Sequence, residues 1–267
     1  MPDALPAAYD VSLRATAMRR GHFGTPTLYF HEIGSTNDEA GRLAEEGAGE
    51  GTTVIAAAQS AGRGRFGRTW FSPPGAGLYF SVIIRDARAA ALLTLAGGVA
   101  VAEGIRAATA LPVEIKWPND IVIDGGLGRR RKIAGILAEG SAGADGLQHM
   151  VLGIGINVGS AAYPPEIADR ATSVEGELGR EVEPGPLLGE CLCALAGRVR
   201  DLAEGRSATV LSRWSALAPS ATGARVEWDA ASGVLSGTTT GIDRDGALLV
   251  RVGGGIERLV SSALRWR

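Results

Sequence analysis

Residues 52–84 read TTVIAAAQSAGRGRFGRTWFSPPGAGLYFSVII. Two β-rich runs, 52–58 and 78–84, flank a loop whose first part, Gln59 to Arg68, carries three glycines and three arginines. Glycine lets a backbone approach a ligand and present its N–H groups, and each guanidinium adds fixed positive charge. The stretch therefore predicts an anion site between two strands. A merely solvated basic turn is the alternative.

This loop differs from two common phosphate-binding loops. No Lys-Ser or Lys-Thr pair closes it, as a Walker P-loop requires. A strand follows it, whereas a helix follows the dinucleotide-binding fingerprint. Any anion bound here is held by another kind of site.

Outward from the loop, strand patterns come in runs and helical patterns gather elsewhere. The spacing of Thr36 and Glu39 resembles a capping box, which predicts a helix to about residue 46. Further helices are expected over 11–20, 92–110 and 185–214, and further strands over 27–33, 113–116, 121–123, 133–138 and 147–156. This order favours an α+β fold, with a mixed or antiparallel sheet on which helices pack. Residues 124–131, rich in glycine and arginine, predict a mobile hairpin tip.

The C-terminal part of the chain has a different sequence pattern. After a hinge at 218–220, short β-rich runs alternate with turns at 243–246 and 253–255, which fits a small β-barrel. We therefore expect a lead-in over 1–25, a main domain over 26–218 and a barrel over 221–267.

Composition limits the partners. The 267 residues carry 27 Lys plus Arg and 29 Asp plus Glu, with a net charge of −2. Such a chain lacks the broad positive field that favours DNA or an anionic membrane. The longest uncharged stretch, 89–102, is shorter than the roughly 20 residues of a membrane-spanning helix, and no signal peptide opens the chain. We expect a cytoplasmic protein without DNA or membrane partners.

Metal-binding spacings are also missing. Cys191 and Cys193 are the only two cysteines, too few for a disulfide framework or a four-ligand zinc site, and the three histidines are isolated. We expect no resident metal and assign the cysteines to buried packing.

A second motif, Lys116-Trp117-Pro118-Asn119-Asp120, ends a short strand. Proline keeps the preceding residue extended, so the turn at Asn119 and Asp120 can hold Lys116 and Asp120 near one another. A cation and a carboxylate there could orient phosphates and a metal. The alternative is a buried tryptophan with a surface ion pair.

Two more motifs lie in apolar strands. Lys132 leads a strand in which Gly135 removes a side chain, so its ammonium can point into a pocket or simply reach solvent. Gly153 and Gly155 alternate in the next strand, which ends at Asn157. A flat ligand could lie over these two glycines, with Asn157 offering a donor and an acceptor. Close helix packing is the alternative.

Together these motifs resemble the biotin protein ligases over about residues 30–267. The matching landmarks are the Gly34-Ser35-Thr36-Asn37 turn, Gln59 and the 62–68 loop with Trp70, the 116–120 pentapeptide, 132–137, 153–157 and the terminal barrel. The resemblance implies a fold like class II aminoacyl-tRNA synthetases with an SH3-like barrel. It also implies a two-step enzyme, in which biotin and ATP give biotinyl-5'-AMP and a lysine of a biotin carboxyl carrier protein then receives the biotinyl group.

The resemblance also implies residue roles. Ser35, Thr36, Asn37 and Gln59 would meet the ureido end of biotin, backbone groups of Arg63, Gly64 and Arg65 would close the site, and Trp70, Gly135, Gly153 and Gly155 complete the implied biotin site. Lys132 would reach the carboxyl and phosphate region. Arg65, Arg68, Lys116 and Asn119 would serve ATP, Asn157 would read adenine, and Asp120 would orient the reacting groups, with Lys132, Arg65, Lys116 and Asp120 as the catalytic set.

The chemistry of the first step agrees with these roles. A carboxylate is already ionised at neutral pH, so adenylation needs cations and not a general base. ATP with Mg²⁺ is the expected cosubstrate, and a monomer or weak homodimer is expected.

The sequence departs from the family pattern at two places. Phe66 stands where the family loop often has a basic or polar residue, and no tryptophan follows Asn157 before residue 186 to stack on adenine. Because about 26 residues precede the first expected strand, we expect no N-terminal DNA-binding domain of the kind that some family members carry.

Two rival functions follow from the same residues. A lipoate protein ligase shares the fold and the adenylate chemistry, although the residues of the Gly/Arg loop and of the 116–120 motif favour biotin. A nucleic-acid-binding regulator could use the arginine loop and the barrel, but the acidic balance disfavours it.

Overall fold

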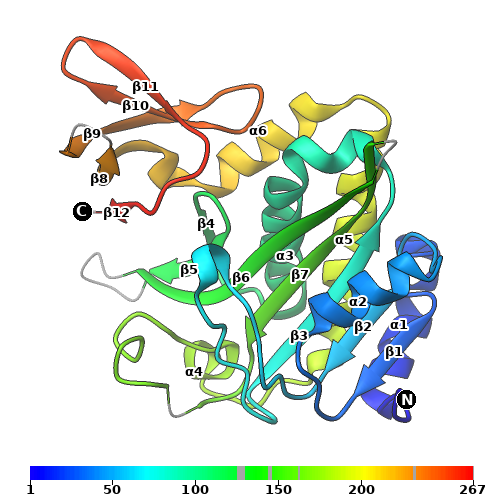
Figure 1. Ribbon diagram of the computed structural model, residues 1–267. Coiled ribbons are helices and arrows are strands. Elements are labelled where there is room, and N and C mark those ends of the chain that lie inside the picture. Colours follow the sequence, from blue (N-terminus) through cyan, green and yellow to red (C-terminus); the bar gives the residue numbers. More distant parts are fainter. Residues whose placement is uncertain (125–129, 144–145, 162, 231–232, 267) are drawn as a thin grey trace.

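The computed structural model describes residues 1–124, 130–143, 146–161, 163–230 and 233–266 (Figure 1). Within them, seven strands form the main sheet in the order β1-β2-β3-β7-β6-β5-β4. Their bounds are β1 Thr27–Phe30, β2 Thr53–Ala56, β3 Gly77–Ile84, β4 Glu114–Lys116, β5 Asp120–Asp124, β6 Arg130–Gly143 and β7 Gly146–Asn157. β1 and β2 pair in parallel and the other neighbours are antiparallel. The expected mixed sheet is confirmed.

Helices cover the two faces of this sheet unequally. The helices α3 (Leu93–Thr109) and α5 (Pro184–Ala203) lie on one face, and α1 (Ala7–Arg20) packs beside α5 (Figure 1). The opposite face carries α2 (Thr36–Glu45), which packs on β2, β3 and β7. The rest of that face is left to loops, and there the predicted site residues gather.

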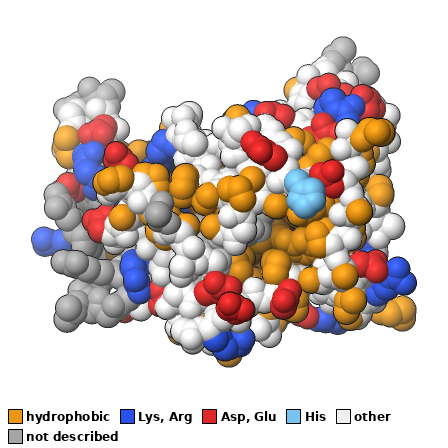
Figure 2. Space-filling model, turned by 90° about the horizontal axis from the view of Figure 1, so that it is seen from below, with side chains coloured by type: hydrophobic (Ala, Val, Ile, Leu, Met, Phe, Trp, Pro, Cys, Tyr) orange, Lys and Arg blue, Asp and Glu red, His pale blue; other side chains and the backbone are white. Residues whose placement is uncertain are grey.

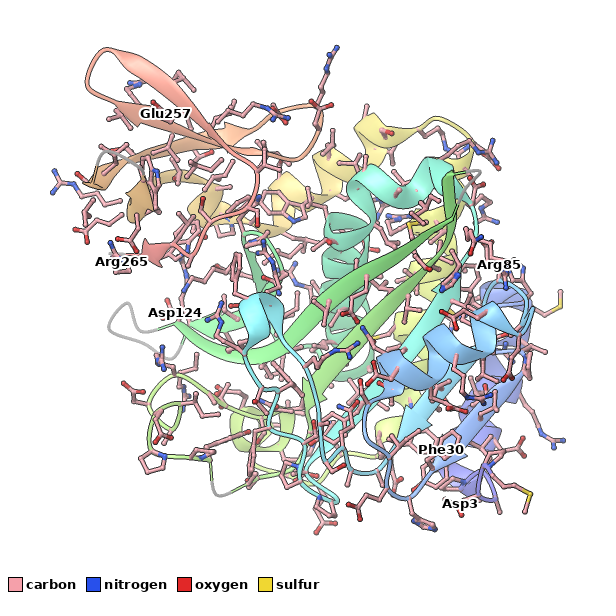
Figure 3. The ribbon with its side chains drawn as sticks, in the orientation of Figure 1. Asp3, Phe30, Arg85, Asp124, Glu257 and Arg265 are labelled. Carbon is pink, nitrogen blue, oxygen red and sulfur yellow. The ribbon has the colours of Figure 1, made fainter. Side chains whose placement is uncertain are left out.

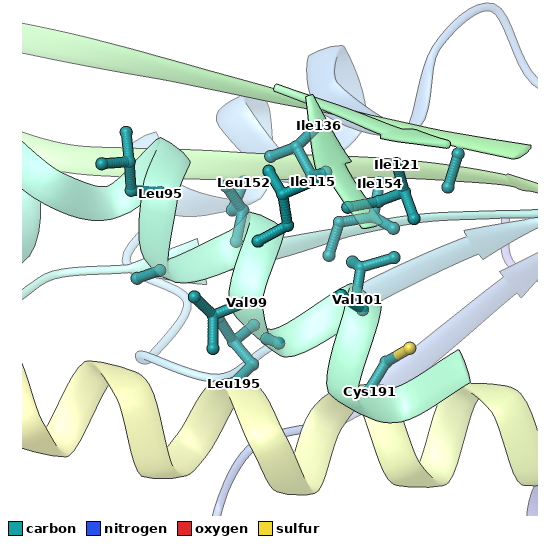
Figure 4. Packing of buried hydrophobic residues seen from close by; sticks show 14 of the residues in the cluster. Leu95, Val99, Val101, Ile115, Ile121, Ile136, Leu152, Ile154, Cys191 and Leu195 are labelled. Carbon is teal, nitrogen blue, oxygen red and sulfur yellow. The ribbon is translucent and has the colours of Figure 1, made fainter. Parts of the chain in front are cut away.

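Alternation along the strands divides the sheet into these two faces. Ile136, Leu152 and Ile154 point toward α3 and belong to the main apolar core (Figure 4). Because successive strand residues face opposite sides, Gly135, Gly153 and Gly155 present the other face. At these glycines, no side chain covers this face of the sheet.

The core under the sheet is closely packed. A Cβ on Gly104 of α3 would lie 2.5 Å from the Cys191 sulfur of α5, so only glycine permits this helix approach. Burial raises the pKa of the Cys191 thiol, as expected for a packing cysteine. The segment 87–109 is the one described helical stretch long and apolar enough to cross a membrane, and 72% of its most apolar window is buried inside the protein.

Several element boundaries differ from the sequence prediction. The helix expected over 185–214 is two helices, α5 and α6 (Ser207–Leu217), because Gly205 between them adopts a φ of +75°. The capping box at Thr36 and Glu39 is wrong: Ser35 is the N-cap residue, and the Thr36 hydroxyl bonds to other elements. β6 and β7 are also longer than expected, and residues 125–129 of the predicted hairpin tip lie outside the described residues.

Among the described residues, four shorter elements lie between the main helices and strands. They are the 3-10 turns η1 (Arg65–Gly67), η2 (Ala87–Leu92) and η3 (Pro219–Ala221) and the helix α4 (Val174–Leu178). η3 stands where the sequence predicts a hinge, directly before the C-terminal strands.

The described C-terminal strands form a second, antiparallel sheet in the order β11-β10-β9-β8-β12. Their bounds are β8 Thr222–Ala230, β9 Gly233–Ile242, β10 Leu248–Val252, β11 Gly255–Leu259 and β12 Arg265–Trp266. The indole N–H of buried Trp117 donates to the Gly246 carbonyl at 3.1 Å and ties the two sheets together. The C-terminal sheet is therefore anchored beside the 116–120 motif.

The surface charges are mixed. Seen from below, acidic and basic side chains are interspersed among apolar ones (Figure 2). This view agrees with the near-neutral net charge of −2.

Candidate active site

A cavity of about 410 Å³ opens on the face of the sheet opposite α3 and α5. Side chains from the 59–76 loop, from the β4–β5 turn and from β6 gather there, near the C-terminal sheet that bears Arg265 (Figure 3). Every site residue predicted from the sequence lines this cavity: Ser35, Thr36, Asn37, Gln59, Arg63, Gly64, Arg65, Arg68, Trp70, Lys116, Asn119, Asp120, Lys132, Gly135, Gly153, Gly155 and Asn157. Segments far apart in the chain thus meet in one hollow, from Ser35 near the start to Trp266 near the end.

Three glycines form the floor. Gly135 and Gly155 are cross-strand partners in β6 and β7. A Cβ on Gly155 would lie 2.4 Å from the Trp70 indole nitrogen, and one on Gly153 would lie 2.1 Å from Asn37 Oδ1. Without side chains, the floor admits a flat group, and in this structure the Trp70 indole lies over Gly135 and Gly155 while Asn37 lies over Gly153. Its buried N–H has no hydrogen-bond partner among the described residues.

Buried polar groups line the end of the cavity near α2. The backbone N–H and hydroxyl of Thr36 donate to Gln59 Oε1 at 2.8 and 3.1 Å. Ser81, fully buried in β3, donates to the Thr36 hydroxyl at 2.7 Å and lies 2.6 Å from Asn37 Oδ1. Asn37 Nδ2 donates to Glu139 at 2.6 Å. This network fixes the orientation of each amide and hydroxyl, so the end of the cavity offers preset donors and acceptors.

Sequence reasoning missed Ser81. Its only signal was a hydroxyl residue within the apolar run LYFSVII. A fully buried serine there needs polar partners, because an unpaired buried hydroxyl is costly.

The three loop arginines do not share one role. Arg63 pairs with Asp38 and, at 2.8 Å, with Glu139, so two carboxylates already neutralise it. The expectation that all three guanidiniums stand ready for a ligand anion is therefore wrong for Arg63. Its two ion pairs instead hold the loop against α2 and β6.

Arg65 and Arg68 remain as cations of the loop. Arg65 donates to Asn119 Oδ1 at 3.4 Å and to Ser261 Oγ at 2.9 Å, so it bridges the main and C-terminal sheets. Burial lowers the pKa of Arg65. Both guanidiniums lie near the exposed Phe66 ring, at 4.8 and 5.9 Å from its centre. Phe66 therefore places an aromatic ring beside these two arginines, at a position where the family loop often has a third basic or polar residue.

The two lysines lie on neighbouring strands. Lys116 and Asp120 are partners across the β4–β5 turn, but Asp120 gives its carboxylate to Lys132 Nζ at 2.5 Å. The Lys132 ammonium also lies 4.9 Å from the centre of the Trp70 ring. Burial lowers the pKa of Lys116, and the nearby cations Arg130, Lys132 and Arg170 add to this, while Asp120 opposes it.

The balance of charge in the cavity favours an anion. Asp120 is the one carboxylate among the described residues that line it, against Arg65, Arg68, Lys116 and Lys132 on the same walls. Excess positive charge in a partly enclosed site attracts phosphate and carboxylate groups.

Asn157 ends β7 at the opposite wall. Its Nδ2 donates to the Thr172 carbonyl at 3.0 Å, and the Tyr163 hydroxyl donates to the same carbonyl at 3.3 Å. The residue before Thr172, Ala171, forms a parallel bridge with Lys132. The segment after Asn157 is thus fastened to the strand that carries Lys132.

Several cavity residues carried no signal that sequence reasoning used. They are Phe71, Arg130, Tyr163, Ile167, Arg170, Ser262, Ala263, Leu264 and Trp266. Phe71 and Tyr163 face one another edge to face at 6.5 Å between ring centres. The last four come from the C-terminal segment, which the predicted division of the chain had placed apart from the site.

The described residues contain no group of three His, Cys, Asp or Glu side chains arranged to hold a metal ion. Magnesium often binds through one or two carboxylates together with substrate phosphates. Asp120 supplies one such carboxylate in the cavity.

Comparisons with known proteins identify the family of this chain. Residues 29–157 match the model of the Biotin/lipoate A/B protein ligase family. The bifunctional ligase/repressor BirA of Bacillus spizizenii is 35% identical over 244 residues, covering 90% of this chain and 73% of the relative. A biotin–[acetyl-CoA-carboxylase] ligase of Paracoccus denitrificans is 36% identical over 225 residues, covering 81% of this chain and 90% of the relative.

The solved structures agree with these relatives. The biotin protein ligase of Aquifex aeolicus in complex with biotin and ATP superimposes with a TM-score of 0.77 at 29% identity, covering 90% of this chain and 99% of that one. The chain therefore belongs to the biotin protein ligase family.

Proposed function

We propose that this protein is an ATP-dependent biotin protein ligase that makes biotinyl-5'-AMP and transfers the biotinyl group to a lysine of a biotin carboxyl carrier protein. In the first step a biotin carboxylate oxygen bonds to the α-phosphorus of ATP and pyrophosphate leaves. In the second, the lysine amine attacks the acyl carbon, AMP leaves, and the amine loses a proton. The observation that carries the proposal is the pairing of a buried polar end with a cationic region in one cavity.

The polar end supports biotin over lipoate. The ureido group of biotin has two N–H donors and a carbonyl acceptor, which match the amides and hydroxyls of Thr36, Asn37 and Gln59. A dithiolane ring offers neither N–H donors nor a carbonyl acceptor, so it would gain none of these hydrogen bonds. Ser35 and the backbone of Arg63, Gly64 and Arg65 complete this end in the proposal.

The cationic region supports adenylate chemistry. Lys132 serves the reacting carboxylate and phosphate, and Arg65, Arg68 and Lys116 hold the phosphates. Asn119 supports Arg65, to which its Oδ1 lies within 3.4 Å, and Asp120 orients Lys132 through their ion pair. Asn157 contacts adenine. Biotin binds over the floor of Gly135, Gly153 and Gly155, and the Trp70 side chain shifts to pack against it. Magnesium accompanies ATP, with Asp120 as the carboxylate within reach.

The organisation of the chain is proposed in the same terms. Residues 26–218 form the catalytic domain after a lead-in at 1–25, and 221–267 form an SH3-like barrel, supported by five short antiparallel strands. A cytoplasmic protein that is a monomer or a weak homodimer, without DNA or membrane partners, fits the mixed surface charge.

A transfer assay tests the function. The protein is incubated with ATP, Mg²⁺ and a purified carrier domain, with isotope-labelled biotin or lipoate in parallel, and the intact mass of the carrier is measured. We expect the carrier to gain one biotinyl group at its acceptor lysine and to gain nothing in a variant in which that lysine is arginine. Preferential attachment of lipoate, or no attachment of either acid, would overturn the proposal.

A further inference from the structure

Lys116 is held in an unusual way for a cation in a cavity. Among the residues that the structure describes, its side chain makes no hydrogen bond and no ion pair, because its cross-strand partner Asp120 is bonded to Lys132. Its recorded contact is the ring of Trp266, whose centre lies 5.7 Å from the Lys116 ammonium nitrogen. Both residues line the same cavity.

Trp266 comes from the far end of the chain. It lies on β12, where it pairs with Val226 of β8, and it packs against the main apolar core. The neighbouring Arg265 pairs with Asp229 at 3.0 Å on the outside of the same sheet. Ser261, just before this strand, accepts a hydrogen bond from Arg65 at 2.9 Å. The C-terminal segment is thus fastened at two points before Trp266.

An indole face and a carboxylate position a lysine differently. A carboxylate takes one of the ammonium N–H donors and cancels its charge, so it competes with a phosphate. An aromatic face attracts the ammonium through its quadrupole and takes no donor and no charge. Lys116 therefore keeps three donors and its full charge for a ligand.

We propose that Trp266 is a positioning residue of the ligase reaction, which holds the Lys116 ammonium ready for the phosphates of ATP and makes the C-terminal strand part of the nucleotide site. This inference rests on the proposed function. Lys132 provides an internal comparison, since its ammonium lies over the Trp70 ring but also pairs with Asp120. The lysine without a carboxylate partner is the one that depends on the C-terminal sheet.

The test uses the full-length protein in a biotin-dependent ATP–pyrophosphate exchange assay. At position 266, tryptophan is replaced site-specifically by mono-, di- and trifluorotryptophan, which weaken the ring quadrupole stepwise with little change in shape. We expect the KM for ATP to rise with each fluorine, reaching about three- to thirtyfold for Trp266→Leu, while the KM for biotin stays constant. An equal KM for ATP across the series would overturn the proposal.

Two controls separate positioning from general damage. In a Lys116→Met background the same series should have no further effect on the KM for ATP, because the cation that the ring holds is gone. Arg265→Gln removes the neighbouring ion pair with Asp229 and should leave the KM for ATP within about twofold of wild type. An effect of fluorination that persists without Lys116, or an equal effect of Arg265→Gln, contradicts the inference. Absence of biotin-dependent exchange in the wild type would instead contradict the proposed function.

Discussion

Replacing Lys132 with alanine removes an ammonium that lies 2.5 Å from Asp120 Oδ1 and 4.9 Å from the centre of the Trp70 ring. One cation about 4 Å from a phosphate contributes about 4 kcal/mol of attraction at an effective dielectric near 20, before desolvation. Loss of a preorganised contact of this kind typically lowers a rate by about 100- to 1,000-fold. We expect a loss of that size in adenylate formation by Lys132→Ala.

The ion pair predicts how this loss combines with a second substitution. Without Lys132, the Asp120 carboxylate stands unpaired in a cavity that must accept phosphates, so its repulsion adds to the loss. Lys132→Ala with Asp120→Asn should therefore be impaired less than the product of the two single effects, with a coupling of about 1–3 kcal/mol.

The assay is biotin-dependent ATP–pyrophosphate exchange at saturating substrates, with thermal unfolding measured beside it. Arg131→Ala is the matched control: Arg131 neighbours Lys132 on β6 but pairs with Glu177 at 2.8 Å and does not line the cavity. It should keep near wild-type exchange. Near-normal exchange by Lys132→Ala, or an equal loss in Arg131→Ala, would refute the reasoning.

Three further predictions concern the loop and Lys116. Arg65→Gly removes the bridge to Ser261 and should release adenylate, seen by mass spectrometry as biotin on lysines outside the carrier site; labelling confined to the acceptor lysine would count against a closing role. Arg63→Glu should weaken adenylate retention about tenfold through repulsion from Asp38 and Glu139, and adding Glu139→Arg should restore part of it, whereas no rescue would argue against this role of the two ion pairs. Burial lowers the pKa of Lys116, and the amine is charged only below its pKa, so ATP affinity should fall as pH rises toward a value below the ordinary lysine pKa. Lys116→Arg, which stays charged, should shift that fall to higher pH, and superimposable pH profiles would contradict the role of the charge.

The sequence predicted the walls of the site well because the relevant residues sit at strand ends and in the loop between strands. Gly135, Gly153 and Gly155 share one face by simple alternation, and Lys132 and Asn157 lie at the ends of the strands that carry them. Local pattern is enough to place such residues.

What the sequence left open depends on contacts between distant segments. Arg63 forms an ion pair with Glu139, 76 positions away, and is therefore not free for a ligand. Arg65 donates a hydrogen bond to Ser261, 196 positions away. Residue types alone indicate that an arginine will find a partner but not which one. The part of Trp266 in the cavity was missed for the same reason, because contacts between the C-terminal segment and the 116–120 motif decide it.

The central claim is that the cations of the loop and of residues 116 and 132 act together on biotin and ATP in one cavity. A single-turnover experiment tests it most directly: enzyme in excess over labelled biotin is mixed with ATP and Mg²⁺ without any carrier, and biotinyl-5'-AMP is measured by mass spectrometry. We predict nearly complete conversion of biotin to enzyme-bound adenylate in the wild type and strongly slowed formation in Lys116→Met and Lys132→Ala. Absence of adenylate in the wild type, or unchanged formation in both variants, would contradict the claim.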